Sequence, residues 1–139
     1  MTDIFDKEKR SFIMSRIKGK NTKVELMVYR YLRQQKIYFQ KHYRTKVGVR
    51  VDVALPRKKK AIFIDGDFWH GRTLDKVRAR RPADDFWVRK LERNIERDKE
   101  QMKLLTEADW QVLRVWETDI VRKRTQQEAF EKIAGFLIK

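Results

Sequence analysis

The sequence predicts an α/β fold in the order α-β-β-β-α-β-α, preceded by a charged N-terminal arm. Two observations indicate it. Apolar residues recur at helical spacing near helix-capping patterns in both halves of the chain. Segments with strand-like composition, separated by short turns, fill the stretch between residues 37 and 65. A chain of 139 residues supports one hydrophobic core, so we expect a single domain over residues 1–139.

The first half is expected to contain the arm, one helix and three strands. Residues 1–20 form the arm, which either docks on the core of residues 21–139 or contacts a ligand. Thr22 and Glu25 match a capping box that predicts a helix over about residues 22–35. Strands are expected from residue 37, over residues 49–55 and over residues 61–65, with a basic turn before the last.

The second half begins with an irregular, arginine-rich stretch. A long helix follows over about residues 84–107, because apolar residues lie broadly on one side of it. Residues 111–116 predict a fourth strand. A second capping box, at Thr125 and Glu128, predicts the start of a C-terminal helix.

The charge of the chain points to a polyanionic partner. Thirty-five Lys and Arg against twenty Asp and Glu give a formal net charge of +15. The basic residues are spread along the sequence, which indicates a folded electropositive surface suited to nucleic acid. No apolar run is long enough to span a bilayer and no signal-peptide pattern is present, so we expect a cytoplasmic protein without membrane contact.

The absence of cysteine limits the metal chemistry that is possible. It excludes disulfides and thiolate zinc sites, and two histidines alone make a structural zinc unexpected. Any catalytic metal must therefore rely on carboxylates. Such ligands favour Mg²⁺ or a similar hard ion such as Mn²⁺.

Asp52 and Asp65 are the candidate metal ligands. If residues 49–55 and 61–65 pair as a hairpin around the basic turn, position 52 faces position 65 with Cβ atoms roughly 5 Å apart. A divalent cation between the two carboxylates would turn their repulsion into a binding site. Asp52 interrupts a strand in which Asp is disfavoured, whereas Asp65 is also compatible with ordinary turn chemistry.

The residues after Asp65 add an aromatic pair and a base. Phe68 and Trp69 lie in an expected loop, where they either stack on or wedge into DNA or cap the core. His70 titrates near neutrality and could accept the proton of an attacking water. Lys90 and Asn94, four residues apart on the long helix, could reach one ligand together.

Several blocks match, in order and spacing, one family over nearly the whole chain. The most specific are Asp-Gly-x-Phe-Trp-His-Gly at residues 65–71, Arg-Asn-x-x-Arg-Asp at residues 93–98, and x-Trp-x-Val-Leu-x-x-Trp-Glu at residues 109–117. In these blocks the chain resembles the very-short-patch mismatch repair endonucleases. The resemblance implies a restriction-endonuclease-like (PD-(D/E)xK-type) core, with a mixed β-sheet flanked by helices. It also implies magnesium-dependent nicking of double-stranded DNA beside a T:G mismatch.

The resemblance also implies roles for single residues. Asp52 would ligate the metal, with Asp65 at the neighbouring position and the backbone carbonyl of Ile64 as a further ligand. His70 would activate water, oriented by Asp98, with Glu25 nearby. The residues implied in DNA contacts are Met14, Phe68, Trp69, Trp87, Lys90 and Asn94.

One departure from the family bears on specificity. Its members typically hold a structural zinc around the Phe-Trp-His loop and after the Trp-Glu pair, where this chain has Asp67, Arg72 and Thr118. We therefore expect no structural zinc, and a loop over residues 66–81 held by packing or salt bridges. Two alternatives stay open: a nuclease of homing, restriction or phage-defence type that cuts matched DNA, and a non-catalytic DNA-binding module. A monomer that joins the nucleoid when bound to DNA is expected.

Overall fold

A four-stranded mixed sheet forms the centre of the computed structural model, which describes residues 22–67, 72, 74–81 and 85–139. Its order is β1-β2-β3-β4, with β1 at Gln40–Arg44, β2 at Arg50–Leu55, β3 at Lys60–Asp65 and β4 at Gln111–Trp116. β1 pairs with β2 and β2 with β3 in antiparallel orientation, and β4 runs parallel to β3. The expected α/β fold with a mixed sheet is confirmed.

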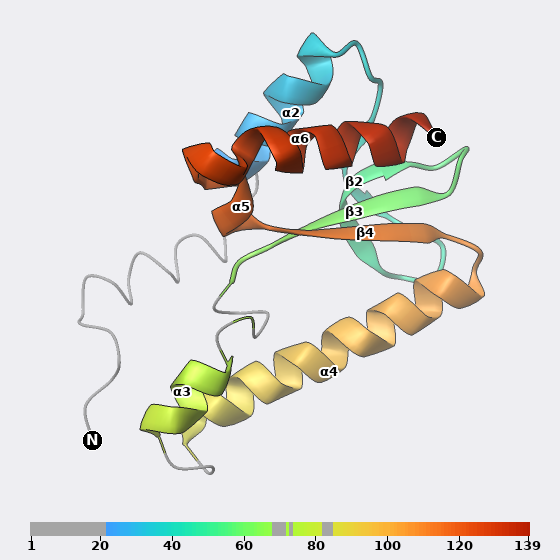
Figure 1. The fold of residues 1–139 in the computed structure, drawn as a ribbon. Helices are drawn as coiled ribbons and strands as arrows, with labels where there is room; N and C mark the ends of the chain where they lie inside the picture. Colours follow the sequence, from blue (N-terminus) through green and yellow to red (C-terminus); the bar gives the residue numbers. More distant parts are fainter. Residues whose placement is uncertain (1–21, 68–71, 73, 82–84) are drawn as a thin grey trace.

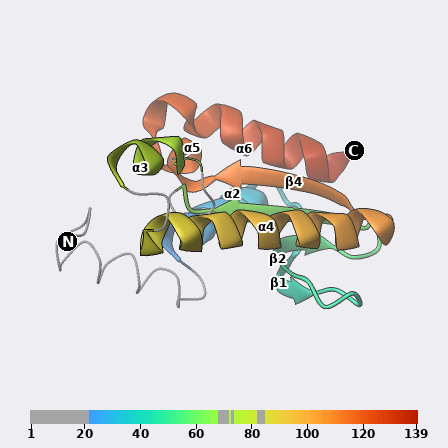
Figure 2. The same cartoon turned by 90° about the horizontal axis from the view of Figure 1, so that it is seen from below.

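Helices cover both faces of the sheet (Figure 1). On one face lie α2 (Lys23–Gln34), α5 (Glu117–Val121) and α6 (Lys123–Ile138), and on the other lies α4 (Phe86–Glu107), with α3 (Leu74–Arg80) beside its N-terminal part. Figure 2 shows α4 running across the opposite face of the sheet from α6. Among the described residues, no helix combines the length and apolar content that crossing a bilayer requires.

Each face has its own apolar core. Val53, Ile62 and Ile64 of the sheet pack with α2, α5 and α6, whereas Val51, Ala61 and Phe63 pack against Leu105 of α4. The alternation along β3 is what a strand with both faces covered requires. In β2, Val51 and Val53 belong to different cores although they are two residues apart. The regular pleat is therefore interrupted at Asp52.

The two predicted capping boxes differ in outcome. The first is confirmed, because the Thr22 hydroxyl accepts from the Glu25 N–H and a Glu25 oxygen accepts from the Thr22 N–H. The second is wrong, because α6 begins at Lys123 and places Thr125 inside the helix. The Thr125 hydroxyl instead donates to the Asp119 carbonyl at 2.8 Å, which ties α6 to the short helix before it.

The predicted register of the β2–β3 hairpin is also wrong. Val53 pairs with Ile62 and Leu55 with Lys60, so the ladder is shifted by two residues and Asp52 does not face Asp65. The connection is a four-residue turn, in which the Lys58 N–H donates to the Leu55 carbonyl. The turn covers residues 56–59 rather than the expected residues 56–60, because Lys60 already pairs with Leu55.

Smaller differences concern the ends of elements. The first strand begins at Gln40 rather than residue 37, because Ile37 and Phe39 pack against the α2–α6 core before the ladder starts. Helices α3 and α5 lie in stretches that were not expected to be helical. Both are short, and short helices carry little periodic signal.

The basic turn between β2 and β3 supports helix ends. Lys60 is buried, and its ammonium donates to the Phe136 carbonyl at 2.7 Å. Lys58 reaches the Leu137 carbonyl at 3.3 Å, and Lys59 the Ala108 carbonyl at 3.2 Å. Cations at helix C-termini satisfy carbonyls that lack intrahelical partners. Part of the positive charge of the chain is therefore structural.

Asp85 fixes the start of α4. One of its oxygens accepts from the Trp87 N–H at 2.9 Å and the other from the Arg81 guanidinium at 3.0 Å. Burial would raise the pKa of Asp85, but hydrogen bonds from Arg81 and from the backbone outweigh burial and lower this pKa below its ordinary value. The ionised carboxylate is therefore the form that holds the helix end.

This arrangement predicts an acid-dependent loss of stability. A carboxylate with a lower pKa in the folded state contributes stability above about pH 4 and loses it as the pH falls through the lowered pKa. We expect Asp85→Asn to lower the Tm by a few degrees at pH 7, and to lose less Tm than the parent between about pH 5 and pH 2. Thermal scans against pH test this, with the exposed Asp75→Asn as control. Parallel losses in parent and Asp85→Asn would contradict it.

Candidate active site

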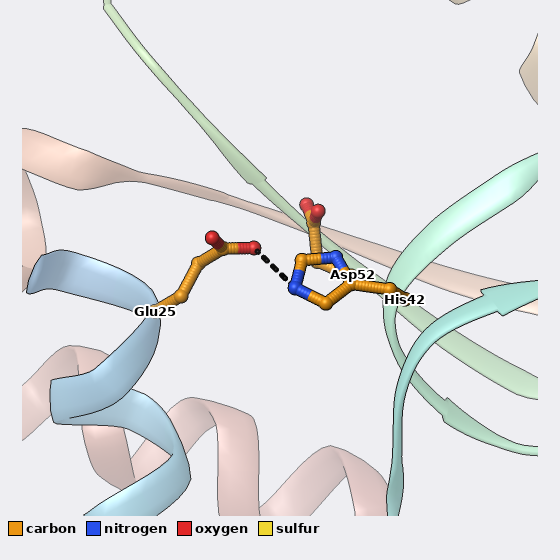
Figure 3. A group of neighbouring side chains, drawn as sticks. All are labelled: Glu25, His42 and Asp52. Atoms are coloured by element: carbon orange, nitrogen blue, oxygen red, sulfur yellow. Dashed lines mark ion pairs between the residues drawn. The ribbon is translucent and has the colours of Figure 1, made fainter. Parts of the chain in front are cut away.

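Three side chains from three elements converge at one end of the sheet. Glu25 comes from α2, His42 from β1 and Asp52 from β2, and each offers a ligand atom within 4.8 Å of those of the other two (Figure 3). The His42 Nε2 lies 3.6 Å from a Glu25 oxygen. Glu25 is buried, and the other two residues are half-buried. The group combines two carboxylates and an imidazole, all of which can bind a metal ion.

The sheet itself brings His42 and Asp52 together. Lys41 pairs with Val53 and Tyr43 with Val51, so His42 and Asp52 occupy facing positions between these two pairs. His42 has a φ of 48°, a left-handed backbone conformation that is uncommon for a residue other than glycine. This conformation interrupts the strand at the level of Asp52, where the pleat of β2 is also irregular.

Tyr29 of α2 lies at the centre of the same group. Its hydroxyl is 3.4 Å from a Glu25 oxygen, from the His42 Nε2 and from the Asp52 backbone carbonyl. Burial, followed by the negative charges of Glu25 and Asp52, raises the pKa of Tyr29 far above its ordinary value. Tyr29 thus stays protonated, and its hydroxyl can donate a hydrogen bond to a neighbouring acceptor.

The Asp52 carboxylate also contacts the main chain of β3. Its Oδ2 accepts a hydrogen bond from the Ile64 N–H at 2.7 Å. A residue in an antiparallel ladder turns its N–H and its C=O toward the same neighbouring strand. The Asp52 carboxylate therefore lies beside the main chain of Ile64, and the role of the Ile64 carbonyl as a metal ligand stays a prediction.

Asp65 and Asp98 both contact Arg114. The Arg114 Nε of β4 lies 2.7 Å from an Asp65 oxygen, and its Nη1 lies 3.3 Å from an Asp98 oxygen. The guanidinium also lies 5.0 Å from the centre of the Phe63 ring. Both carboxylates are buried. The structure thus joins Asp65 to Asp98 rather than to the Asp52 side chain, and the role of Asp65 as a metal ligand stays a prediction.

The predicted DNA-contact residues of α4 share a stripe of that helix. Trp87, Lys90, Asn94 and Asp98 recur at spacings of three and four, which places them on one side. Asp98 shows that this side faces the sheet, because it reaches Arg114. Trp87 is only 7 % exposed, whereas the neighbouring Phe86 is 53 % exposed. A DNA contact by the Trp87 ring stays a prediction and requires the ring to leave a buried position.

Four other predicted residues lie outside the described part of the chain. Met14, Phe68, Trp69 and His70 belong to ranges for which the structure gives no description. Their proposed roles as DNA contacts and as general base are untested by the geometry. Asp67 and Arg72, which flank the last three, are described.

Asp67 ties this segment to α5. One Asp67 oxygen accepts from the Thr118 N–H at 3.1 Å, and the other lies 3.1 Å from the Arg72 Nη1. Arg72 also lies 3.4 Å from an Asp119 oxygen and stacks over the Trp116 ring at 5.2 Å. We call Asp67, Arg72, Thr118 and Asp119 the polar clasp. Asp67, Arg72 and Thr118 stand where the family resemblance implied zinc ligands. The contacts link the described residues Asp67 and Arg72 to α5. What holds the rest of the loop stays a prediction.

The polar clasp predicts how the fold responds to chelation. Asp67→Ala removes the acceptor of the Thr118 N–H and the partner of Arg72, and we expect it to cost about 1–2 kcal/mol of unfolding free energy. Because protein groups form the hydrogen bond and ion pairs of the clasp, EDTA is expected to leave the Tm of the parent unchanged. Thermal scans with and without EDTA test both expectations. A loss of Tm in EDTA as large as that in Asp67→Ala would instead indicate a bracing metal.

Two residues of these groups were not singled out from the sequence. The sequence could have indicated His42, because it is one of only two histidines and follows the start of a predicted strand. Its partnership with Glu25 depends on how α2 packs, which no sequence spacing gives. Arg114 lay among many basic residues, and only the parallel pairing of β3 with β4 brings it to Asp65.

The sequence of this chain is similar to those of known endonucleases over most of its length. The family model described as DNA mismatch endonuclease Vsr matches residues 2–76. The chain is 35% identical to the type II nicking enzyme V.NmeAIP of Neisseria meningitidis serogroup A, over 96% of the chain and 94% of that protein. It is 33% identical to the type II nicking enzyme V.HpaIIP of Haemophilus parainfluenzae, with 88% and 86% covered. It is 35% identical to the DNA mismatch endonuclease Vsr of Escherichia coli K12, with 84% and 74% covered.

Proposed function

The chain belongs to the Vsr family of DNA mismatch endonucleases, and we propose that it is a metal-dependent endonuclease that nicks one strand of DNA beside a T:G mismatch. Strand nicking is supported by relatives named as nicking enzymes that align over most of both chains. The observation that carries the proposal is Asp52, whose carboxylate lies on the main chain of Ile64 and close to Glu25 and His42.

The residues at Asp52 fit a divalent cation. Oxygen ligands from a carboxylate and a backbone carbonyl suit Mg²⁺ or Mn²⁺. Burial and, after it, the negative charges of Glu25 and Asp52 raise the pKa of Tyr29, so both carboxylates act on this place. We propose Asp52 and the Ile64 carbonyl as ligands, with Asp65 at the neighbouring position. A bound cation would stabilise the charge that develops on the scissile phosphate.

The side chains around this centre have separate tasks in the proposal. His70 takes the proton from the attacking water, and Asp98 orients His70. Arg114 holds Asp98 on the sheet at 3.3 Å, so the carboxylate has a fixed position from which to act. Glu25 contributes negative charge beside Asp52. The enzyme acts as a monomer on double-stranded DNA in the cytoplasm, where it joins the nucleoid when bound.

Mismatch selection rests on the deformability of DNA. A mismatched step costs less free energy to unstack than a matched one, so an aromatic wedge selects it without reading every base. Phe68, Trp69 and Trp87 are the proposed wedge, and Met14, Lys90 and Asn94 contact the target. The relative named a mismatch endonuclease supports this substrate.

A panel of duplexes tests the function. Purified protein is incubated with Mg²⁺ and otherwise identical duplexes that carry a T:G pair, another mismatch or no mismatch, with Asp52→Ala in parallel. We expect nicking of one strand of the T:G duplex, and none by Asp52→Ala. Equal nicking of matched and mismatched duplexes would overturn mismatch specificity and favour a nuclease that acts on matched DNA. If no duplex is cut in the presence of the metal, the proposal that the protein is an endonuclease is overturned.

A further inference from the structure

We propose that Glu25, His42 and Asp52 form a cation site in which the His42 imidazole is a direct ligand, so that it binds Co²⁺ and Mn²⁺ more tightly than Mg²⁺. The inference rests on the proposed function in taking Asp52 as a metal ligand, and it adds a nitrogen donor to that ligand set. Its basis is the convergence of three ligand atoms, within 4.8 Å of one another, from α2, β1 and β2 (Figure 3).

The distances fit a shared ion after small side-chain rotations. Ligand atoms that lie about 2.1 Å from one ion are about 3–4 Å from each other. The Glu25 oxygen and the His42 Nε2, at 3.6 Å, already meet this condition. The same 3.6 Å is longer than the roughly 2.7–2.9 Å of a tight charge-assisted hydrogen bond. The pair is thus spaced for an ion between its atoms rather than for direct contact.

The groups around the site hold two of the ligands in place. One Glu25 oxygen accepts from the Thr22 N–H at 2.9 Å in the capping box, which leaves the other oxygen directed at His42. The Tyr29 hydroxyl lies 3.4 Å from both Glu25 and His42. Such outer contacts orient metal ligands and are a usual part of metal sites.

The backbone of His42 points to a function for its side chain. A φ of 48° within a strand costs free energy and forfeits regular pairing at this position. In return, the conformation places the imidazole between two carboxylates of different elements. Pairing with β2 alone would not require a positive φ at His42.

The chemistry of the donors sets the metal preference. Carboxylate oxygens bind Mg²⁺ and Mn²⁺, whereas an imidazole nitrogen adds affinity for later transition-metal ions. The affinity of a mixed site rises from Mn²⁺ to Co²⁺. We therefore expect the order Co²⁺ over Mn²⁺ over Mg²⁺, with His42 responsible for most of the difference.

Calorimetric titration of the metal-free, full-length protein with CoCl₂, MnCl₂ and MgCl₂ tests the site. The variant is His42→Asn, because asparagine tolerates a positive φ and keeps the backbone conformation. We expect His42→Asn to weaken Co²⁺ binding at least about tenfold and to change Mg²⁺ binding less than about threefold. The exposed Glu128→Gln is the control and is expected to bind as the parent does. Thermal scans confirm that each variant is folded.

The outcomes separate this inference from the proposed function. If His42→Asn binds Co²⁺ as tightly as the parent while the parent nicks DNA in Mg²⁺, the His42 ligand is overturned and the function stands. If Co²⁺ binding depends on His42 but no duplex is cut with any of the three ions, the site stands and the function is overturned. As a second readout, Co²⁺ should shift the NMR signals of the His42 ring in the parent, and unchanged signals would overturn the site.

Discussion

Asp52→Asn is expected to abolish metal-dependent cleavage, with a loss on the order of a thousandfold or more in rate. The substitution is nearly isosteric, and the amide oxygen can still accept the hydrogen bond that the Ile64 N–H now donates to Oδ2. What it removes is the negative charge, which is the feature that a divalent cation requires. The rate of nicking of a labelled T:G duplex, under single-turnover conditions in Mg²⁺, measures the loss.

The Tm of Asp52→Asn shows whether the loss of activity comes from the missing charge or from damage to the fold. The charges of Asp52 and Glu25 both raise the pKa of Tyr29, so the two carboxylates lie in one negative region. Removing one of them relieves repulsion, and we expect the Tm of Asp52→Asn to equal or exceed that of the parent. Asp109→Asn, at an exposed turn position with a φ of 66°, is the matched control and should alter neither quantity. An inactive variant with a much lower Tm would contradict a role through charge.

Local sequence signals were sufficient for most of the fold. Residues 111–116 form a strand as predicted, and the Thr22–Glu25 box begins α2, because strand composition and capping chemistry act over a few residues. The hairpin register was not predictable in the same way, because it depends on the residue at which the turn closes, and the Leu55–Lys60 pair moved every pair by two residues. The capping pattern at Thr125 was misleading, because the Thr125 hydroxyl donates a hydrogen bond to the Asp119 carbonyl of α5 instead of capping α6.

The candidate site depended more heavily on tertiary structure. Asp52 stood out because a carboxylate is unusual inside a strand. In the structure it accepts a hydrogen bond from the Ile64 N–H and lies close to Glu25 and His42. The predicted facing of Asp52 and Asp65 rested on the register and was wrong with it, whereas the role of Asp65 as a metal ligand, which the resemblance also implied, stays a prediction. Pairs that join separate elements, such as Glu25 with His42, depend on packing angles and on the irregular backbone at residue 42. Neither property is encoded in a local spacing.

The loss of Arg114 is expected to lower the stability of the fold strongly. Its guanidinium contacts Asp65 at 2.7 Å and Asp98 at 3.3 Å, and the exposed fractions of these two carboxylate side chains are only 3% and 10%. Buried carboxylates interact strongly because water screens them poorly. Removing the cation leaves two negative charges near each other between β3, β4 and α4. Breaking a buried ion pair in this way costs about 3 kcal/mol or more.

We therefore expect Arg114→Met to lower the Tm by on the order of 10 °C at pH 7, whereas Arg97→Met, at an exposed position of α4, should lower it little. Arg114→Lys should recover only part of the loss, since an ammonium cannot engage both carboxylates with the two parallel hydrogen bonds of a guanidinium. Thermal scans of the three variants at pH 7 measure these differences. A Tm of Arg114→Lys equal to that of Arg114→Met would mean that the stabilising role of Arg114 lies in its packing over Phe63 rather than in its charge.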